Sequence, residues 1–322
     1  MAWSAASWDD ADLAFLRGKG AHGMSESSKG QAFGLLFVTF FIWGSVYVGG
    51  KMIANEVPAA LLACLRCCAA MIPLLWMSRK YRSIKIAKED WKYFFIVGLI
   101  GYFLTIFCIQ WGISLTGASM ASLINALTPV SVTILAAVIL KEKITPIKVV
   151  CLVLALAGAF VITQGAGTQS ETMGIVVVLS SVIFWGFASV HMRRLTAKYP
   201  AVLVTTYSMA ISLLCHVPVG LFTLATQPVE FSPKAVLVIL YLGFAGSGVA
   251  QFTWVKCLSI LPASTCSLFY PLQPVFSALL GAAILGETFT PAFFVGLLLI
   301  SIDVALSTWE TKKLSAAEQT KV

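Results

Sequence analysis

Ten long apolar stretches constrain this chain more than any other feature of its sequence. A helix needs about 20 mostly apolar residues to cross a ~30 Å hydrocarbon layer. Stretches of about that length lie at 32–53, 58–78, 92–113, 118–140, 146–164, 172–192, 201–224, 234–255, 263–285 and 291–308. Because these runs are continuous rather than alternating, they exclude a membrane β-barrel. We therefore predict an all-α integral membrane protein with ten transmembrane helices.

The composition excludes the main soluble classes. Of the 322 residues, 59% are hydrophobic and 11% are charged, whereas about 25% of a soluble domain is charged. So few charges cannot cover the surface of a soluble globule, which argues against a cytosolic enzyme, a nucleic-acid binder and a disordered protein. We expect membrane lipids as partners and no nucleic acid.

The basic residues predict the orientation of the chain. Lys and Arg are retained on the cytoplasmic side of a membrane. With both termini in the cytoplasm, nineteen of the 22 basic residues fall inside, only Lys51 and Lys234 fall outside, and Arg66 lies within a span. This pattern predicts a multi-pass cell-membrane protein. Its compact loops favour a bacterial cytoplasmic membrane, with a eukaryotic organelle as the alternative.

The ends of the chain are expected to be cytoplasmic tails at residues 1–30 and 309–322. The first thirty residues carry four acidic side chains and no apolar core, so they do not form a signal peptide. Met24 is an alternative start to Met1. The eight cysteines lie in or beside spans, where they are expected to be packing residues, and we predict no metal and no cofactor.

An internal repeat divides the apolar region into two halves. Residues 114–146 align with 259–291 without a gap and are identical at nearly half of the positions. A weaker match at an offset of 142 pairs Trp43-Gly44 with Trp185-Gly186. Two copies of an odd number of spans enter the membrane from opposite sides, and inverted repeats of this kind are typical of secondary transporters.

These residues resemble a known family. Trp-Gly in the first span, Arg in the second, Pro within the fourth and Leu-x-Glu-x-x-Thr-Pro before the fifth are similar to the EamA family of the drug/metabolite transporter superfamily. The resemblance covers a first repeat at 31–164 and a second at 172–308. It implies a ten-helix carrier with a cavity lined by helices 1–4 and 6–9. Arg66 departs from the repeat, because its counterpart is Ser208.

The candidate functional residues are polar or aromatic side chains inside spans, where they are costly without a partner or a cavity. The predicted substrate-binding residues are Trp43, Tyr47, Arg66, Gln110, Asn125, Trp185, Gln251 and Tyr270. Pro129 and Pro274 are predicted gates, because each frees a carbonyl one turn earlier, at Asn125 and Tyr270.

Structural alternatives stay open for each candidate. Asn125 can bond a neighbouring helix, and interfacial aromatic residues are often anchors. Arg66 has a functional reading, attraction of a substrate carboxylate or phosphate. Its structural reading is an ion pair, with Glu56 or a backbone carbonyl as partner, or snorkelling, and we slightly favour the structural one.

The spans predicted to line the cavity are short of acids: spans 1, 3, 4, 6, 8 and 9 contain no Asp or Glu. Exporters that exchange protons for organic cations need such a carboxylate, and the intramembrane Asp303 falls in the peripheral tenth span. We hypothesise a neutral, zwitterionic or anionic substrate. It moves by facilitated diffusion, by exchange, or through a less obvious proton site such as His216.

The sequence therefore predicts a secondary transporter, an exporter of small metabolites such as amino acids, related compounds or drugs, working by alternating access. The chain contains no phosphate-binding loop for ATP, and we expect no enzymatic activity. A facilitative channel and a membrane receptor or enzyme are the alternatives. A homodimer is compatible with the sequence.

Overall fold

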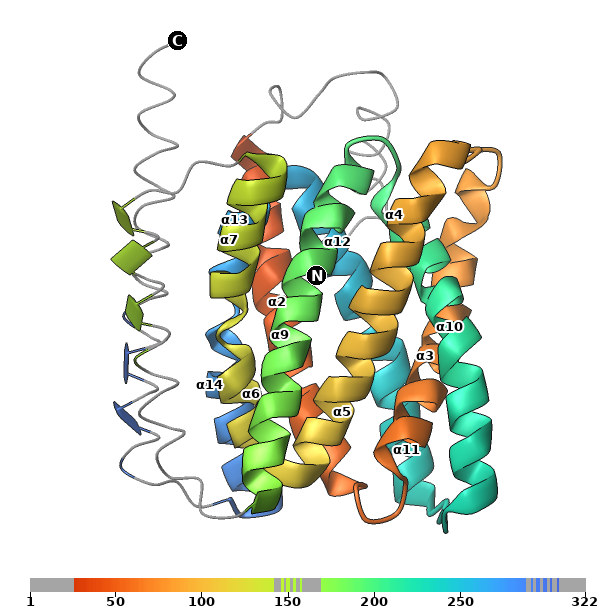
Figure 1. The fold of residues 1–322 in the computed structure, drawn as a ribbon, viewed down its shortest axis with the longest axis vertical. Helices are drawn as coiled ribbons and strands as arrows, with labels where there is room; N and C mark the ends of the chain where they lie inside the picture. Colours follow the sequence, from red (N-terminus) through yellow and green to blue (C-terminus); the bar gives the residue numbers. More distant parts are fainter. Residues whose placement is uncertain are drawn as a thin grey trace.

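A computed structural model of the chain describes residues 26–141 and 169–287, with scattered helical residues at 146–157 and 291–306. Every regular element in these described ranges is a helix. Figure 1 shows the helices running side by side along one direction. Eight of them are long and apolar enough to cross a membrane, which supports a multi-pass membrane protein.

The first half of the chain supplies four crossings. Its helices are α2 (Glu26–Met52), α3 (Ala59–Ser78), η2 (Arg79–Tyr81), η3 (Lys88–Asp90), α4 (Trp91–Ile96), the π-helix η4 (Val97–Leu104), α5 (Thr105–Thr116), α6 (Ala118–Asn125) and α7 (Thr128–Leu140). α4, η4 and α5 form one continuous crossing, and α6 and α7 form another that is interrupted in its middle.

The second half supplies four crossings of matching construction. Its helices are α9 (Gln169–Thr196), α10 (Ala201–Thr226), α11 (Pro233–Tyr241), the π-helix η5 (Leu242–Val249), α12 (Ala250–Ile260), α13 (Ala263–Ser267), α14 (Leu272–Leu280) and the π-helix η6 (Gly281–Leu285). The π-helical segments η4 and η5 are both eight residues long and begin 145 residues apart.

Eight of the ten predicted spans therefore coincide with helices of the structure. The other two, 146–164 and 291–308, lie largely outside the described residues, as does Asp303. The outer sides of the described helices carry large apolar side chains such as Trp76, Val138 and Phe222, each at least 70% exposed. A hydrocarbon layer is the environment that such a surface requires.

Local residue chemistry sets where the helices begin and end. Gly117 adopts a φ of 101°, which allows the sharp turn between α5 and α6. Pro58 and Pro200 stand immediately before α3 and α10. Ser232 caps α11 by accepting a hydrogen bond from the Ala235 amide at 3.0 Å.

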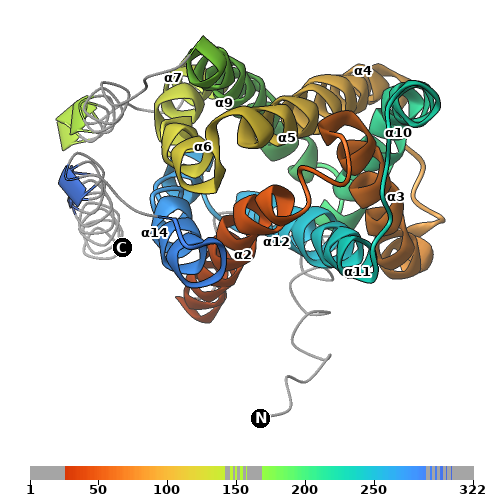
Figure 2. The ribbon, with the colours of Figure 1, turned by 90° about the horizontal axis from the view of Figure 1, so that it is seen from below.

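Helices of the two halves pack against each other throughout the bundle. α2 lies against α12 and α14, α9 lies against α5 and α7, and α3 lies against α10. The view along the bundle in Figure 2 shows α2, α12 and α14 on one side and α5, α7 and α9 on the other. Gly44 allows the close approach of α2 to α14, because a Cβ there would lie 2.7 Å from the Phe276 Cβ. The space between these two sides holds the candidate site.

Candidate substrate cavity

A cavity lies between the two halves, near the middle of the described spans. The empty space among its side chains is about 450 Å³, a volume that includes the open solvent at its mouth. Its lining residues are Trp43, Val46, Tyr47, Arg66, Thr105, Ile106, Ile109, Asn125, Trp185, Gln251, Tyr270 and Gln273. They come from four crossings of the first half and three of the second, and α10 contributes none of them.

Two interrupted helices supply the polar centre of the cavity. α6 ends at Asn125, and the chain turns once before α7 begins with Thr128 and Pro129. The Thr128 hydroxyl donates a 2.6 Å hydrogen bond to the Asn125 carbonyl, the oxygen to which residue 129 would donate in an unbroken helix. Pro274 likewise stands in the first turn of α14. The interruptions lie where the proline positions predicted them.

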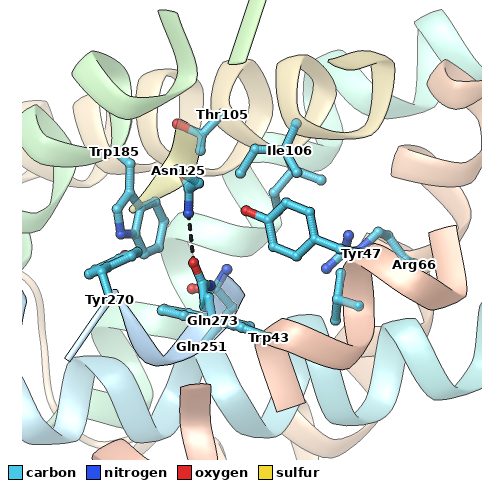
Figure 3. Close-up of a pocket in the computed structure, with 12 residues that line it drawn as sticks. Trp43, Tyr47, Arg66, Thr105, Ile106, Asn125, Trp185, Gln251, Tyr270 and Gln273 are labelled. Atoms are coloured by element: carbon cyan, nitrogen blue, oxygen red, sulfur yellow. Dashed lines mark hydrogen bonds between the residues drawn. The ribbon is translucent and has the colours of Figure 1, made fainter. Parts of the chain in front are cut away.

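The side chains at these interruptions meet across the cavity. Asn125 Nδ2 donates a 2.9 Å hydrogen bond to Gln273 Oε1, and both side chains are buried. Figure 3 shows this bond between the two sides of the pocket. It is a direct polar link between the fourth crossing of the first half and the last described crossing of the second.

Aromatic rings form one end of the cavity. The Trp43 and Trp185 rings meet edge to face with centroids 5.7 Å apart, and Tyr270 lies 5.9 Å from Trp43. Trp254 and Phe40 pack behind Tyr270 at 5.4 and 4.8 Å. The Trp43 indole nitrogen donates to the Gly246 carbonyl in η5. These contacts hold the rings as a rigid apolar wall.

Arg66 lies at the other end of the cavity, where side chains bind it in place of the expected Glu56 or backbone carbonyl. The guanidinium donates to Ser247 Oγ through Nε at 2.8 Å and to Gln110 Oε1 through Nη1 at 3.4 Å. Glu56 instead accepts from the Ser232 hydroxyl at one end of the bundle. Arg66 reaches inward rather than toward an interface, because η5 and α5 offer it polar partners there.

Three polar atoms of the cavity wall have no hydrogen-bond partner among the described residues. They are the Tyr47 hydroxyl in the first half of the chain and Trp185 Nε1 and Gln251 Oε1 in the second. A buried polar atom without a partner costs free energy, about 1–3 kcal/mol. Three such atoms in residues that line one cavity indicate a place for a polar ligand.

The structure brings seven of the eight predicted binding residues around this cavity. Gln110 lies behind the wall, where it holds Arg66 and packs against Gly50. Pro129 and Pro274 lie in the first turns of α7 and α14 rather than on the wall. His216, the predicted alternative proton site, is buried beside the Tyr102 carbonyl and does not line the cavity. Whether these residues bind a substrate stays a prediction.

Sequence reasoning missed the residues Val46, Thr105, Ile106, Ile109 and Gln273. Four of them are apolar or small and lie in runs that contain many similar residues. Gln273 carried a usable signal, since a glutamine beside Pro274 inside a span needs a polar partner. The comparison of the two repeats did not point to Gln273, because the matching residue in the first repeat is Thr128 and not a second glutamine.

The described residues offer little for metal or acid–base chemistry. They contain no group of three His, Cys, Asp or Glu side chains that could hold a metal ion. None of the twelve lining residues is acidic, and Arg66 is the one charged side chain among them. The cavity is equipped for binding a small molecule.

A multi-pass helical bundle with a partly polar cavity between its halves is an architecture that membrane transporters use. The chain belongs to the EamA-like transporter family, whose model matches residues 31–164 and 172–309. Membership of this family shows that the chain is a transporter, and it points away from an enzyme.

Relatives agree with this assignment. An uncharacterized transporter, YetK of Bacillus subtilis, is 25% identical over 87% of each chain. A probable terminal-alkyne amino-acid exporter of Streptantibioticus cattleyicolor is 27% identical over 81% of this chain and 88% of its own. One crystal structure superposes with a TM-score of 0.69 over 88% of this chain and 99% of that one, at 20% identity, which shows the shared fold.

Proposed function

We propose that the chain is a secondary transporter that exports small metabolites, such as amino acids, related compounds or drugs, across the cell membrane by alternating access. The observation that carries this proposal is the cavity, enclosed near mid-span by helices of both halves and crossed by the Asn125–Gln273 hydrogen bond. Export is supported by one relative named as an amino-acid exporter. Both termini are proposed to lie in the cytoplasm.

Alternating access is supported by the matching construction of the two halves. η4 and α5 begin 145 residues before η5 and α12, and α3 begins 142 residues before α10. Inverted repeats make two such halves equivalent, so that they can exchange conformations around one central site. The interrupted helices at the cavity provide points where these conformations can differ.

The proposal is tested by an efflux screen of amino acids and other metabolites in cells with and without the protein. We expect at least one compound to leave expressing cells faster, and Asn125→Ala to reduce that rate severalfold. Asn55→Ala is the matched control, because Asn55 is exposed in a loop between α2 and α3. The proposal fails if expression changes the efflux of no compound.

A further inference from the structure

Arg66 poses a problem of charge that the transport proposal leaves open. Its side chain is 4% exposed, and a cation inside the membrane is costly unless something balances it. Among the described residues, no carboxylate lies within ion-pair distance of it. The cavity therefore carries one positive charge with no counter-charge of its own.

The guanidinium is held in place with donors to spare. Ser247 and Gln110 accept from Nε and Nη1, whereas a guanidinium has five N–H donors. Gln110 is itself fixed, because its amide packs against Gly50. Gly246 leaves room for Nη2 of Arg66, because a Cβ at residue 246 would lie only 3.4 Å from that nitrogen. Two neutral partners from different helices thus orient the guanidinium without neutralising its positive charge.

The cavity has two chemically different ends. Figure 3 shows Arg66 at one end, beside Tyr47, and Trp185 and Tyr270 at the opposite end. The Tyr47 hydroxyl, which has no partner in the described part of the chain, lies between them. A ligand that spans the cavity meets a cation and a hydroxyl with one end and aromatic faces with the other.

We propose that the substrate is an organic monocarboxylate whose carboxylate binds Arg66 and whose apolar or aromatic body packs against Trp43, Trp185 and Tyr270. This inference rests on the proposed function and names its substrate class. A planar carboxylate matches the geometry of the guanidinium fork. Its single negative charge balances the single positive charge of the lining.

The single positive charge of the cavity disfavours other ligand classes. A cation is repelled by Arg66. A phosphate dianion exceeds the one positive charge of the lining. A neutral amide of the same shape leaves the Arg66 charge buried and unpaired.

The test compares ligands that share one phenyl ring: phenylacetate, phenylacetamide, phenethylamine and phenyl phosphate. Each is titrated calorimetrically into the purified wild-type protein in lipid nanodiscs. We expect phenylacetate to bind roughly tenfold to hundredfold more tightly than the amide or the amine, as a charge-assisted hydrogen bond implies. Equal binding of acid and amide, tighter binding of the phosphate, or no binding of the acid at millimolar concentration overturns the proposal.

Variants identify Arg66 as the source of the preference. Arg66→Gln should remove the preference for acid over amide, whereas Arg66→Lys should keep part of it. The matched control Arg82→Gln, an exposed arginine in a loop, should bind as wild type does. A thermal unfolding curve of each variant shows whether it is folded. If an Arg66 variant does not fold, the ligand series on the wild-type protein tests the proposal by itself.

The outcomes separate this inference from the transport proposal. If the efflux screen finds exported compounds but Arg66→Gln leaves their export unchanged, the carboxylate assignment fails and the transporter stands. If expression changes the flux of no compound, whatever its charge, transport itself fails.

Discussion

The hydrogen bond between Asn125 and Gln273 connects residues 148 positions apart in the chain. Both side chains are buried, and the Asn125 carbonyl is occupied by Thr128 rather than by either amide. Each amide is therefore the main partner of the other. Removing one of them leaves a buried polar group unpaired, which costs more than the bond itself contributes.

Because of this asymmetry, Asn125→Ala and Gln273→Ala should not be additive. Each single change is expected to lower the free energy of unfolding by about 1–3 kcal/mol, and the double variant by about 1 kcal/mol less than the sum. Unfolding in mixed detergent micelles measures all three values. Asn125→Ala combined with Thr226→Ala, whose exposed hydroxyl bonds only within α10, should be additive. Additivity of the Asn125–Gln273 pair would contradict the structural account.

Residues at the cavity could be selected from the sequence where the repeat and the helical spacing both applied. Trp43 and Trp185 correspond in the two halves, and Asn125 corresponds to Tyr270, so these residues could be selected without a structure. The partners of Arg66 could not, because Ser247 lies 181 residues away and carries no sign of contact in the sequence. Pairing across such a separation is decided by the packing of whole helices.

At the scale of elements, the interrupted crossings distinguish this bundle from a set of straight rods. α6 and α7 are separated at 126–127, and α13 and α14 at 268–271. Pro129 withholds an amide from Asn125, the last residue of α6, and Pro271 withholds one from Ser267, the last residue of α13. The prolines made these breaks predictable, whereas no residue pattern in the sequence pointed to the π-helical segments η4 and η5.

The prolines should govern conformational change more than binding. In Pro129→Ala, the new amide can donate to the Asn125 carbonyl in place of Thr128, which favours a continuous helix and a single conformer. We expect transport turnover to fall severalfold while the half-saturation concentration changes less than about twofold. Initial rates in proteoliposomes measure both quantities.

Pro233→Ala is the matched control for this prediction. Pro233 also stands in the first turn of a helix, α11, but it is exposed at one end of the bundle. Its replacement should leave both quantities near wild type. A Pro129→Ala variant that loses affinity but keeps its turnover would show that the proline shapes the site and does not act in a conformational step.

At the scale of the whole molecule, side chains join the two halves at both ends of the bundle. At the end where α3 and α9 finish, Tyr199 donates to Asp90 at 2.8 Å and accepts from the Ala87 amide at 3.1 Å. Lys198 also pairs with Asp90 at 3.0 Å. At the opposite end, where α2 finishes, Ser232 donates to Glu56.

The buried hydroxyl of Tyr199 matters more to the first contact than the ion pair does. Lys198 is about half exposed, and exposed pairs contribute little. Its hydrogen bond to the Asp90 carboxylate raises the pKa of Lys198. The pair is therefore present at neutral pH. Its small contribution is lost as the pH rises through the raised pKa of Lys198 or falls through the lowered pKa of Asp90.

Alternating access then predicts opposite effects from loosening the two ends. Tyr199→Phe removes both hydrogen bonds of the hydroxyl, about 2 kcal/mol together, at the basic end, which we propose to be cytoplasmic. That loss shifts the population about thirtyfold toward conformers open to that side. Ser232→Ala should shift it the other way. The reporter is Ile106→Cys on the cavity wall, in a chain whose eight native cysteines are replaced.

Labelling from outside the cell with an impermeant thiol reagent measures the shift. The rate at Ile106→Cys should fall with Tyr199→Phe and rise with Ser232→Ala, while Thr226→Ala changes neither. Rates that move in the same direction in both variants would mean that the contacts stabilise the bundle as a whole. Rates that move in opposite directions would instead support alternating access, because a gain in access to the cavity from one side would then accompany a loss of access from the other.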